Sequence, residues 1–234
     1  MKRGAPLIAA NVAAEGIGTF IVTLVAMGVD ILYYSTHQVD YVSRWLARGF
    51  ATAVVIYSLS EISGAHINPA VTFGFTLRRD FPPVRLVWYW IAQFAGSFAA
   101  AGLLASLFGG AIALGASHPG PTFTPLQAVL TEVVLTAFVM LTILMTAKEK
   151  AAIGKEAALA VGLAVATCGF FAGPISGASM NPARSIAPQV LAGEFGLVWI
   201  YAVGPLVGAA LAVALHGLLT GSPNRAEREA ARGK

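Results

Sequence analysis

Two short stretches of the chain are near copies of one another. Residues 63–70 read SGAHINPA and residues 176–183 read SGASMNPA, so that six of eight positions are identical at a constant offset. Glu15 and Glu132 form a further match at a similar offset. Similarity that recurs at one spacing indicates an internal duplication, which here divides the chain into two halves.

The composition of the chain is typical of a membrane protein. Hydrophobic residues make up 57% of the 234 positions and charged residues only 11%, whereas soluble globular domains average about 25% charged residues. The chain has too little charge to cover a water-exposed surface, so we expect the lipid bilayer as its main partner. The 15 basic residues outnumber the 11 acidic residues, but they form no continuous basic face, and no nucleic-acid partner is expected.

Six segments have the roughly 20 mostly apolar residues that a membrane-spanning helix needs. They are residues 7–29, 41–60, 84–107, 124–147, 156–173 and 195–219. Three fall in each repeat, 7–107 and 124–219, and an odd number of spans means that the two repeats insert with opposite topology. We expect one membrane domain over residues 1–234, with a short polar tail at 221–234 that frays.

The distribution of basic residues predicts the orientation. They gather before the first span, in the two loops that share its side of the membrane, and in the tail. These basic residues are Lys2, Arg3, Arg78, Arg79, Arg85, Lys148, Lys150, Lys155, Arg225, Arg228, Arg232 and Lys234. The 109–123 loop on the other side has no Lys or Arg. Because loops rich in Lys and Arg stay inside the cell, both termini are expected to be cytoplasmic.

In each copy of the repeated stretch, the sequence predicts the start of a short helix. Asn68 and Asn181 are favoured N-cap residues, and each is followed by a proline, which is tolerated at the first helical position. The apolar runs that follow, 70–77 and 183–191, are about half the length needed to cross a bilayer. They therefore predict two half-helices that enter from opposite faces and meet near the midplane.

The meeting point of the half-helices has a predictable electrostatic character. Each helix N-terminus carries roughly half a positive charge, so the junction repels cations and protons, and the amides of Asn68 and Asn181 can donate hydrogen bonds into a pore. The backbone before each Asn can turn its carbonyls toward that pore, because irregular backbone at this depth is tolerated where it lines a wet cavity. The residues concerned are Gly64, Ala65, His66, Gly177, Ala178 and Ser179.

These motifs resemble a known family. The paired boxes Asn68-Pro69-Ala70 and Asn181-Pro182-Ala183, the second extended by Arg184-Ser185, are similar to those of the major intrinsic protein (aquaporin) family, over about residues 10–219. Residues 172–180, AGPISGASM, are most similar to its nodulin-like branch and bacterial relatives. Members of that branch pass glycerol, urea or undissociated metalloid acids, often with poor water flux.

The resemblance carries expectations about fold and assembly. It implies an all-α membrane protein of six transmembrane helices and two re-entrant half-helices in an inverted 3+3 repeat. It also implies a homotetramer in the cell membrane, without a cofactor.

Two acids lie within the predicted spans. An intramembrane acid is costly unless it has a partner, and Glu15 and Glu132 occupy matching places. The resemblance implies that each braces the re-entrant loop of its own half by accepting backbone N–H groups. A proton relay is the alternative.

The resemblance also implies an outer filter of four residues. Arg184 follows the second box and offers its donors to permeants, and counting from the Asn residues places Arg48, Gly169 and Ala178 at the other three positions. The family usually has an aromatic or aliphatic residue where Arg48 stands.

Two directions are open to the Arg48 side chain. Pointing inward, it would face Arg184, and two unit charges about 6 Å apart repel by roughly 3 kcal/mol at an effective dielectric constant of 20. Glu61 cannot compensate, because it lies about 20 Å further along the helix. Pointing outward, the side chain could snorkel to the interface. We favour the outward direction, which leaves a wide constriction between the small Gly169 and Ala178.

The predicted function is passive, bidirectional diffusion of small uncharged solutes (water, glycerol, urea or neutral metalloid acids) with exclusion of protons and ions. One alternative is a water-selective or closed channel whose filter Arg48 narrows. A second is an ion-coupled secondary transporter, since inverted repeats and broken helices occur there too. A third, an intramembrane enzyme using His66 and Glu61, lacks a neighbouring nucleophile. The sequence offers no set of ligands at metal-binding spacing.

Overall fold

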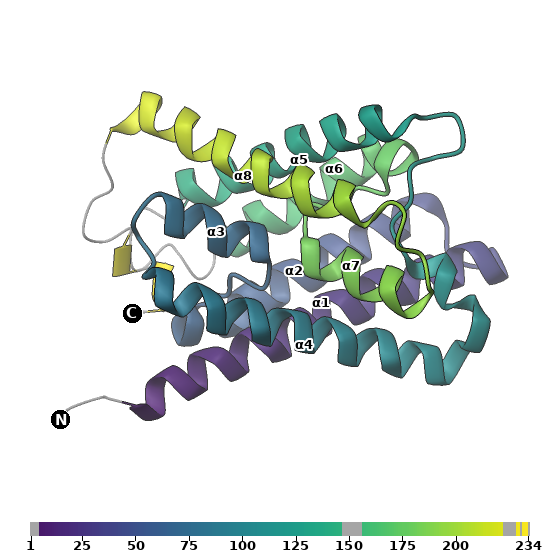
Figure 1. Ribbon diagram of the computed structural model, residues 1–234, viewed down its shortest axis with the longest axis horizontal. Helices are drawn as coiled ribbons and strands as arrows, with labels where there is room; N and C mark the ends of the chain where they lie inside the picture. The colour runs from purple at the N-terminus through teal and green to yellow at the C-terminus, as the bar shows by residue number, and fades with distance from the viewer. Residues whose placement is uncertain (1–4, 147–155, 222–227, 230, 234) are drawn as a thin grey trace.

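The computed structural model describes residues 5–146, 156–221, 228–229 and 231–233 (Figure 1). Within these ranges the chain is helical and has no strand. The helices are α1 (Ala5–Thr36), α2 (Tyr41–Ser63), α3 (Pro69–Leu77), α4 (Pro83–Phe108), the 3-10 helix η1 (Gly109–Gly115), α5 (Pro125–Thr146), α6 (Glu156–Ser176), α7 (Pro182–Leu191) and α8 (Val198–Thr220). Several of the basic residues that predict the orientation lie outside the described residues, namely Lys2, Arg3, Lys148, Lys150, Lys155, Arg225 and Lys234.

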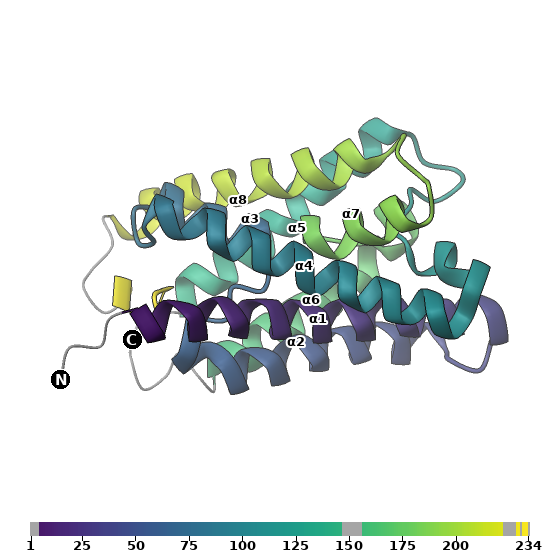
Figure 2. The same ribbon diagram turned by 60° about the horizontal axis from the view of Figure 1, so that its bottom comes forward.

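The helices form the inverted arrangement expected from the repeat. In the first half α1 packs against α2 and α4, in the second half α5 packs against α6 and α8, and α2 against α6 joins the halves. The short helices α3 and α7 lie between the long ones and point away from each other (Figures 1 and 2). This confirms the all-α fold class. We call the end where α1 begins and α8 ends the termini side, and the end that holds η1 the loop side (Figure 1).

Five stretches of the described chain are long and apolar enough to cross a membrane. They are Ala9–Thr36, Pro83–Gly115, Pro125–Thr146, Glu156–Ser176 and Val198–Thr220. Helix α2 is absent from this set although it has 23 residues, because it carries Arg44, Arg48 and Glu61. Arg44 and Arg48 are buried, so the polar side of α2 faces the interior of the protein and not lipid.

Helix α1 is longer than predicted. The expected segment 7–29 ends just before an acid, Asp30, whereas the helix continues to Thr36. Asp30 is 3% exposed, so the predicted end of the span was wrong. The extension places a buried carboxylate inside the bundle.

Two glycines allow the long helices to cross closely. A Cβ atom on Gly96 would lie 2.1 Å from the carbonyl oxygen of Gly16, and one on Gly208 would lie 2.4 Å from that of Val133. The two contacts occupy equivalent places, between α1 and α4 and between α5 and α8. Small residues at helix crossings in membranes allow this close backbone approach.

Each repeat also contains a buried glutamate that binds its own re-entrant loop. Glu15 accepts hydrogen bonds from the backbone N–H groups of His66 (2.9 Å) and Ile67 (2.6 Å) and from the Ser63 hydroxyl (2.7 Å). Glu15 is 0% exposed. The two backbone donors lie one and two residues before Asn68, where the NPA box begins, so this carboxylate fixes the loop where it approaches the midplane.

The second repeat makes the same contacts. Glu132 accepts from the backbone N–H groups of Ser179 (2.9 Å) and Met180 (2.7 Å) and from the Ser176 hydroxyl (2.7 Å). The hydroxyl of Tyr201 donates to the Ser176 carbonyl at 2.7 Å, as Tyr89 donates to that of Ser63 in the first half.

The loops held by these glutamates contain residues in the left-handed region of backbone conformation. Ala65, Ile67, Ala178 and Met180 all have positive φ, between 42° and 55°. A non-glycine residue in the left-handed region costs roughly 1–2 kcal/mol, and the same two positions bear it in each repeat. The hydrogen bonds to the glutamates offset this strain.

A methyl group added at Gly96 tests the close approach of α1 and α4. Gly96→Ala should lower the melting temperature in detergent, because overpacking of this kind costs about 1–3 kcal/mol. Gly102→Ala, on the same helix with no atom within 4 Å of the added carbon, is the matched control. Equal melting temperatures for the two variants would contradict the crossing.

Replacing Glu15 or Glu132 by glutamine tests whether these carboxylates stabilise the re-entrant loops. Both carboxylate oxygens of each glutamate accept a backbone N–H, so in Glu15→Gln or Glu132→Gln the new NH₂ group must face a donor. Leaving a buried donor unpaired costs about 1–3 kcal/mol, so thermal stability and flux should both fall, with the pH dependence of flux unchanged. Glu61→Gln, at an exposed position, serves as control. A shifted pH profile with intact stability would favour a proton relay instead.

Candidate functional site

The two half-helices begin at the centre of the molecule and exchange hydrogen bonds. Asn68 caps α3 by accepting from the N–H of Ala70 at 2.9 Å, and Asn181 caps α7 by accepting from that of Ala183 at 3.1 Å. The Asn68 amide donates to the Met180 carbonyl at 2.7 Å, and the Asn181 amide donates to the Ile67 carbonyl at 2.9 Å. One N–H of each amide therefore joins the two repeats, which leaves the other to face the cavity.

A narrow cavity of about 80 Å³ passes this junction. It extends from Arg48 and Arg184 at its loop-side end, past both Asn residues, to Val71 and Val161 at its termini-side end. The volume has room for a few water molecules.

The cavity brings together most of the predicted site residues. Ala65, His66, Asn68, Ala178, Ser179, Asn181, Arg48 and Arg184 line it. The remaining box residues, Pro69, Ala70, Pro182 and Ala183, are buried in the first turns of the half-helices. Gly64 lines a second cavity on the termini side, and Gly177 lines a vestibule on the loop side.

The outward direction favoured for Arg48 is wrong. Its side chain is 5% exposed, and its guanidinium forms a salt bridge with Asp30 of α1. It also donates to the carbonyls of Ala26 and Gly177, each at 3.4 Å, and lies 4.1 Å from the centre of the Trp45 ring. Arg48 therefore narrows the loop-side end of the cavity.

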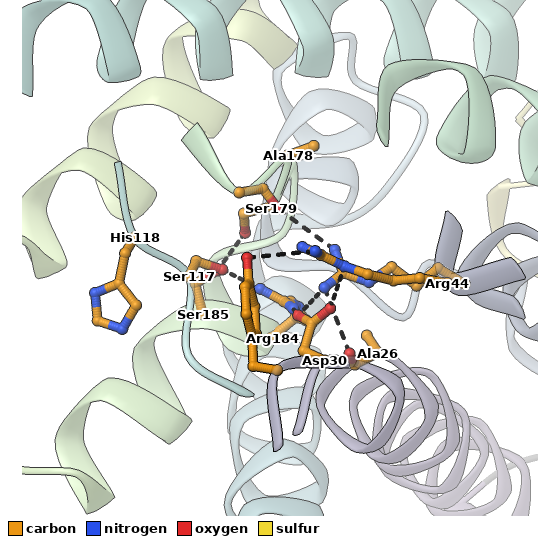
Figure 3. Close-up of polar contacts among 12 residues, drawn as sticks. Ala26, Asp30, Arg44, Ser117, His118, Ala178, Ser179, Arg184 and Ser185 are labelled. Carbon is orange, nitrogen blue, oxygen red and sulfur yellow. Dashed lines mark hydrogen bonds and ion pairs between the residues drawn. The ribbon is translucent and has the colours of Figure 1, made fainter. Parts of the chain in front are cut away.

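Asp30 supplies the acid that the inward direction requires. One of its oxygens, Oδ2, binds both Arg48 and Arg184, the latter at 2.8 Å. The other, Oδ1, lies 2.7 Å from Nε of Arg44. In Figure 3 the carboxylate of Asp30 points from its helix toward the guanidinium groups of Arg44 and Arg184.

Coulomb's law explains why the arginines can remain close together around Asp30. At an effective dielectric constant of 20, attraction between Asp30 and an arginine about 4 Å away is roughly 4 kcal/mol, slightly more than the roughly 3 kcal/mol repulsion between two arginines about 6 Å apart. Stacking on the face of Trp45 adds a cation–π contribution. With three arginines and one aspartate, the cluster of Arg44, Arg48, Arg184 and Asp30 keeps a net charge of +2.

Gly169 does not line the cavity, contrary to the filter position inferred for it. A Cβ atom there would lie 1.9 Å from the Trp45 ring, and one on Gly173 would lie 2.2 Å from the same ring. The two glycines of α6 thus make room for the indole, and Arg48 lies against the indole in turn. Gly169 acts on the constriction only through Trp45.

The loop after η1 completes the constriction. Arg184 donates to the Ser117 hydroxyl, which also contacts the Ser185 hydroxyl at 2.6 Å. Gln189 donates to the Ser117 carbonyl at 2.9 Å. These contacts, several of which appear in Figure 3, hold Arg184 from the side opposite Asp30.

A wider vestibule of about 550 Å³ lies on the loop side of this constriction. Asp30, Arg44, Tyr33 and Tyr34 line it, so four charged or polar side chains face any solute that enters. Across the vestibule His118 lies 3.1 Å from the Glu194 carboxylate, and both side chains are 40% exposed.

Sequence reasoning missed four residues of the constriction: Asp30, Arg44, Trp45 and Ser117. An acid in an apolar helix was the available signal for Asp30, since such a residue needs a partner. Nothing in the sequence pointed to Ser117 as a contact of Arg184, because serine is common in loops.

Comparisons with known proteins identify the family of the chain. A family model described as Major intrinsic protein matches residues 5–216. Aquaporin NIP2-2 of Zea mays is 38% identical over 205 residues, which cover 87% of this chain and 69% of that relative. Aquaporin NIP1-1 of Oryza sativa subsp. japonica is 38% identical over 202 residues, which cover 85% and 70%.

A solved structure supports the same fold. The X-ray structure of the aquaglyceroporin from Plasmodium falciparum matches with a TM-score of 0.81 at 23% identity, covering 89% of this chain and 95% of that chain. At this identity the similarity concerns the fold alone. With the family model spanning most of its length and curated aquaporins as relatives, the chain belongs to the major intrinsic protein family, in its nodulin-like branch.

Proposed function

We propose that this protein is a narrow passive channel that passes uncharged solutes close to water in size, and that it excludes ions and protons. The observation that carries this proposal is the convergence of Arg48 and Arg184 on one carboxylate oxygen of Asp30 at the end of the cavity. Family membership makes the chain a membrane-embedded passive channel for small solutes and not an enzyme. The size limit and the ion exclusion are our proposal.

Two positive elements in series support ion exclusion. The N-termini of α3 and α7 meet at the Asn pair, and each contributes roughly half a positive charge. The arginine cluster, with a net charge of +2, adds a second barrier to cations on the loop side. Since Asp30 leaves many guanidinium N–H groups free, neutral solutes with acceptor oxygens can still be bound there.

The inward Arg48 supports a small size limit. Ala178 contributes little volume and Gly169 contributes none to the cavity, so the two arginines set the width. Glycerol, urea and neutral metalloid acids, which the nodulin-like resemblance suggested, should therefore pass slowly compared with water. The alternative hypothesis is a wide pore for such solutes, and it requires the Arg48 side chain to leave the cavity.

The setting in the membrane follows from the charge distribution. We propose that the termini side is cytoplasmic, because the basic residues predicted to remain inside the cell gather there. We also propose the cell membrane as location and a homotetramer as assembly, as the family resemblance implies.

Permeability ratios test the size limit. Arg48→Ala removes the guanidinium and should raise the ratio of glycerol to water permeability severalfold, measured by stopped-flow light scattering on proteoliposomes at matched protein density. Arg85→Ala, at a half-buried position on the termini side that does not line the cavity, is the control and should match wild type. A high wild-type ratio that Arg48→Ala leaves unchanged would support the wide pore.

Single-residue charge changes test ion exclusion. Asn68→Asp places a negative charge where the two dipole ends meet, so cation conductance in planar bilayers should rise above wild type. Asn68→Ala loses the same amide bond to Met180 without adding charge, and should not show this rise. A robust sodium or proton current in the wild type would refute the barrier.

A further inference from the structure

The described part of the C-terminal tail lies against the protein and is not frayed, contrary to the sequence-based expectation. We call Arg228, Glu229, Ala231, Arg232 and Gly233 the docked tail. Ala231 is only 2% exposed. In Figure 1 this segment lies on the termini side, beside the start of α4 and close to α3.

Contacts to three separate parts of the first repeat hold the docked tail. The Ala231 carbonyl lies 2.9 Å from Nε2 of His66, and Nε of Arg232 donates to the Asp80 carbonyl at 2.8 Å. The backbone at Gly233 passes so close to the end of α2 that a Cβ atom there would lie 2.6 Å from the Ile62 carbonyl oxygen. The contacts join the end of α2, the re-entrant loop and the turn after α3.

These three elements surround the termini-side opening of the permeation path. Ala231 lines a cavity of about 40 Å³ together with Gly64 and Phe75. Five residues, Ile56, Ala65, Val71, Ile143 and Val161, line both this cavity and the one that passes the Asn pair. The docked tail therefore lies on the route that a solute must take.

The docking site is also matched to the tail chemically. Ala231 packs in an apolar cluster with Val71, Phe75, Phe81 and Leu144, where its methyl group needs no polar partner. The His66 ring is held in place by stacking on Phe75, with ring centres 4.8 Å apart, and by a 3.2 Å contact of Nδ1 with the Thr72 hydroxyl.

Gly233 makes the fit specific. Its φ is +67°, a value that glycine adopts freely and that side chains with a branched Cβ resist. Together with the short distance to Ile62, this allows only glycine at the point where the tail crosses the end of α2.

We propose that the docked tail is an autoinhibitory plug, which closes the termini-side mouth by binding His66 and Phe75 and opens the channel when it leaves. Release would expose Nε2 of His66 to the path, two residues from Asn68. The plug acts at the opposite end of the path from Arg48, so it controls how much passes and not which solute passes. The proposal rests on the channel activity of the family and not on the size limit proposed above.

Two point variants of the full chain test the plug. Gly233→Val adds a branched side chain where none fits, and Arg232→Ala removes the bond to Asp80. Each should raise water permeability per channel at least about threefold over wild type, with the ratio of glycerol to water permeability unchanged. Gly217→Val is the matched control, because an added Cβ on that exposed glycine of α8 meets no atom within 4 Å.

Hydrogen–deuterium exchange of the same samples reports docking independently of flux. Amides of residues 228, 229 and 231–233 should exchange slowly in wild type and in Gly217→Val, and fast in the two tail variants. Fast exchange in wild type would overturn the docking, and a released tail with unchanged permeability would overturn the plug. If neither variant releases the tail, deletion of residues 222–234 decides, and unchanged permeability after that deletion refutes the proposal.

Discussion

Two buried carboxylates hold the parts of this channel that have no helical hydrogen bonds of their own. The loops before Asn68 and Asn181 run through the middle of the protein, where unpaired backbone N–H groups would be costly. Glu15 and Glu132 accept those groups, two for each glutamate. With the loops fixed, the Asn amides can reach across to the carbonyls of the opposite repeat, and the two half-helices start at one point.

The arginine cluster on the loop side depends on the same arrangement. Arg184 follows the second box in α7, so its position is set by the brace at Glu132. Arg48 comes from α2 and Asp30 from α1, and the two meet Arg184 only because α1 continues to Thr36. Arg184 directly follows the duplicated motif, but its counterpart in the first repeat is Val71, and neither Arg48 nor Asp30 has a charged counterpart in the second repeat. The constriction is therefore built from residues that the two halves do not share, which is how a symmetric scaffold acquires an asymmetric filter.

The duplicated features could be predicted from the sequence because each leaves a local signal. The Asn-Pro pairs predict helix starts, and matched acids predict matched roles. Asp30 was missed for a specific reason: the predicted span ended at residue 29, one position before it, so the carboxylate was placed outside the bundle. Without that acid, Arg48 had no partner in reach and the outward direction followed.

Gly169 shows the limit of counting along the chain. Its distance from Asn181 gives its depth in the membrane, but not the direction it faces, which the bulk of Trp45 decides. A glycine is equally compatible with an open lumen and with a large neighbour, and only the packing distinguishes the two.

The two ends of the path are built on different physical principles. The loop-side end is narrowed by charges whose attraction and repulsion nearly balance, so its width responds to the removal of a single guanidinium. The termini-side end is occupied by backbone and a methyl group, held by a hydrogen bond, an apolar cluster and a glycine crossing. Charges discriminate among solutes, because they interact differently with ions, acceptors and apolar groups, whereas a backbone plug blocks all of them alike. Selectivity and opening can therefore change independently in this chain, since Arg48 and Ala231 share neither a partner nor a cavity.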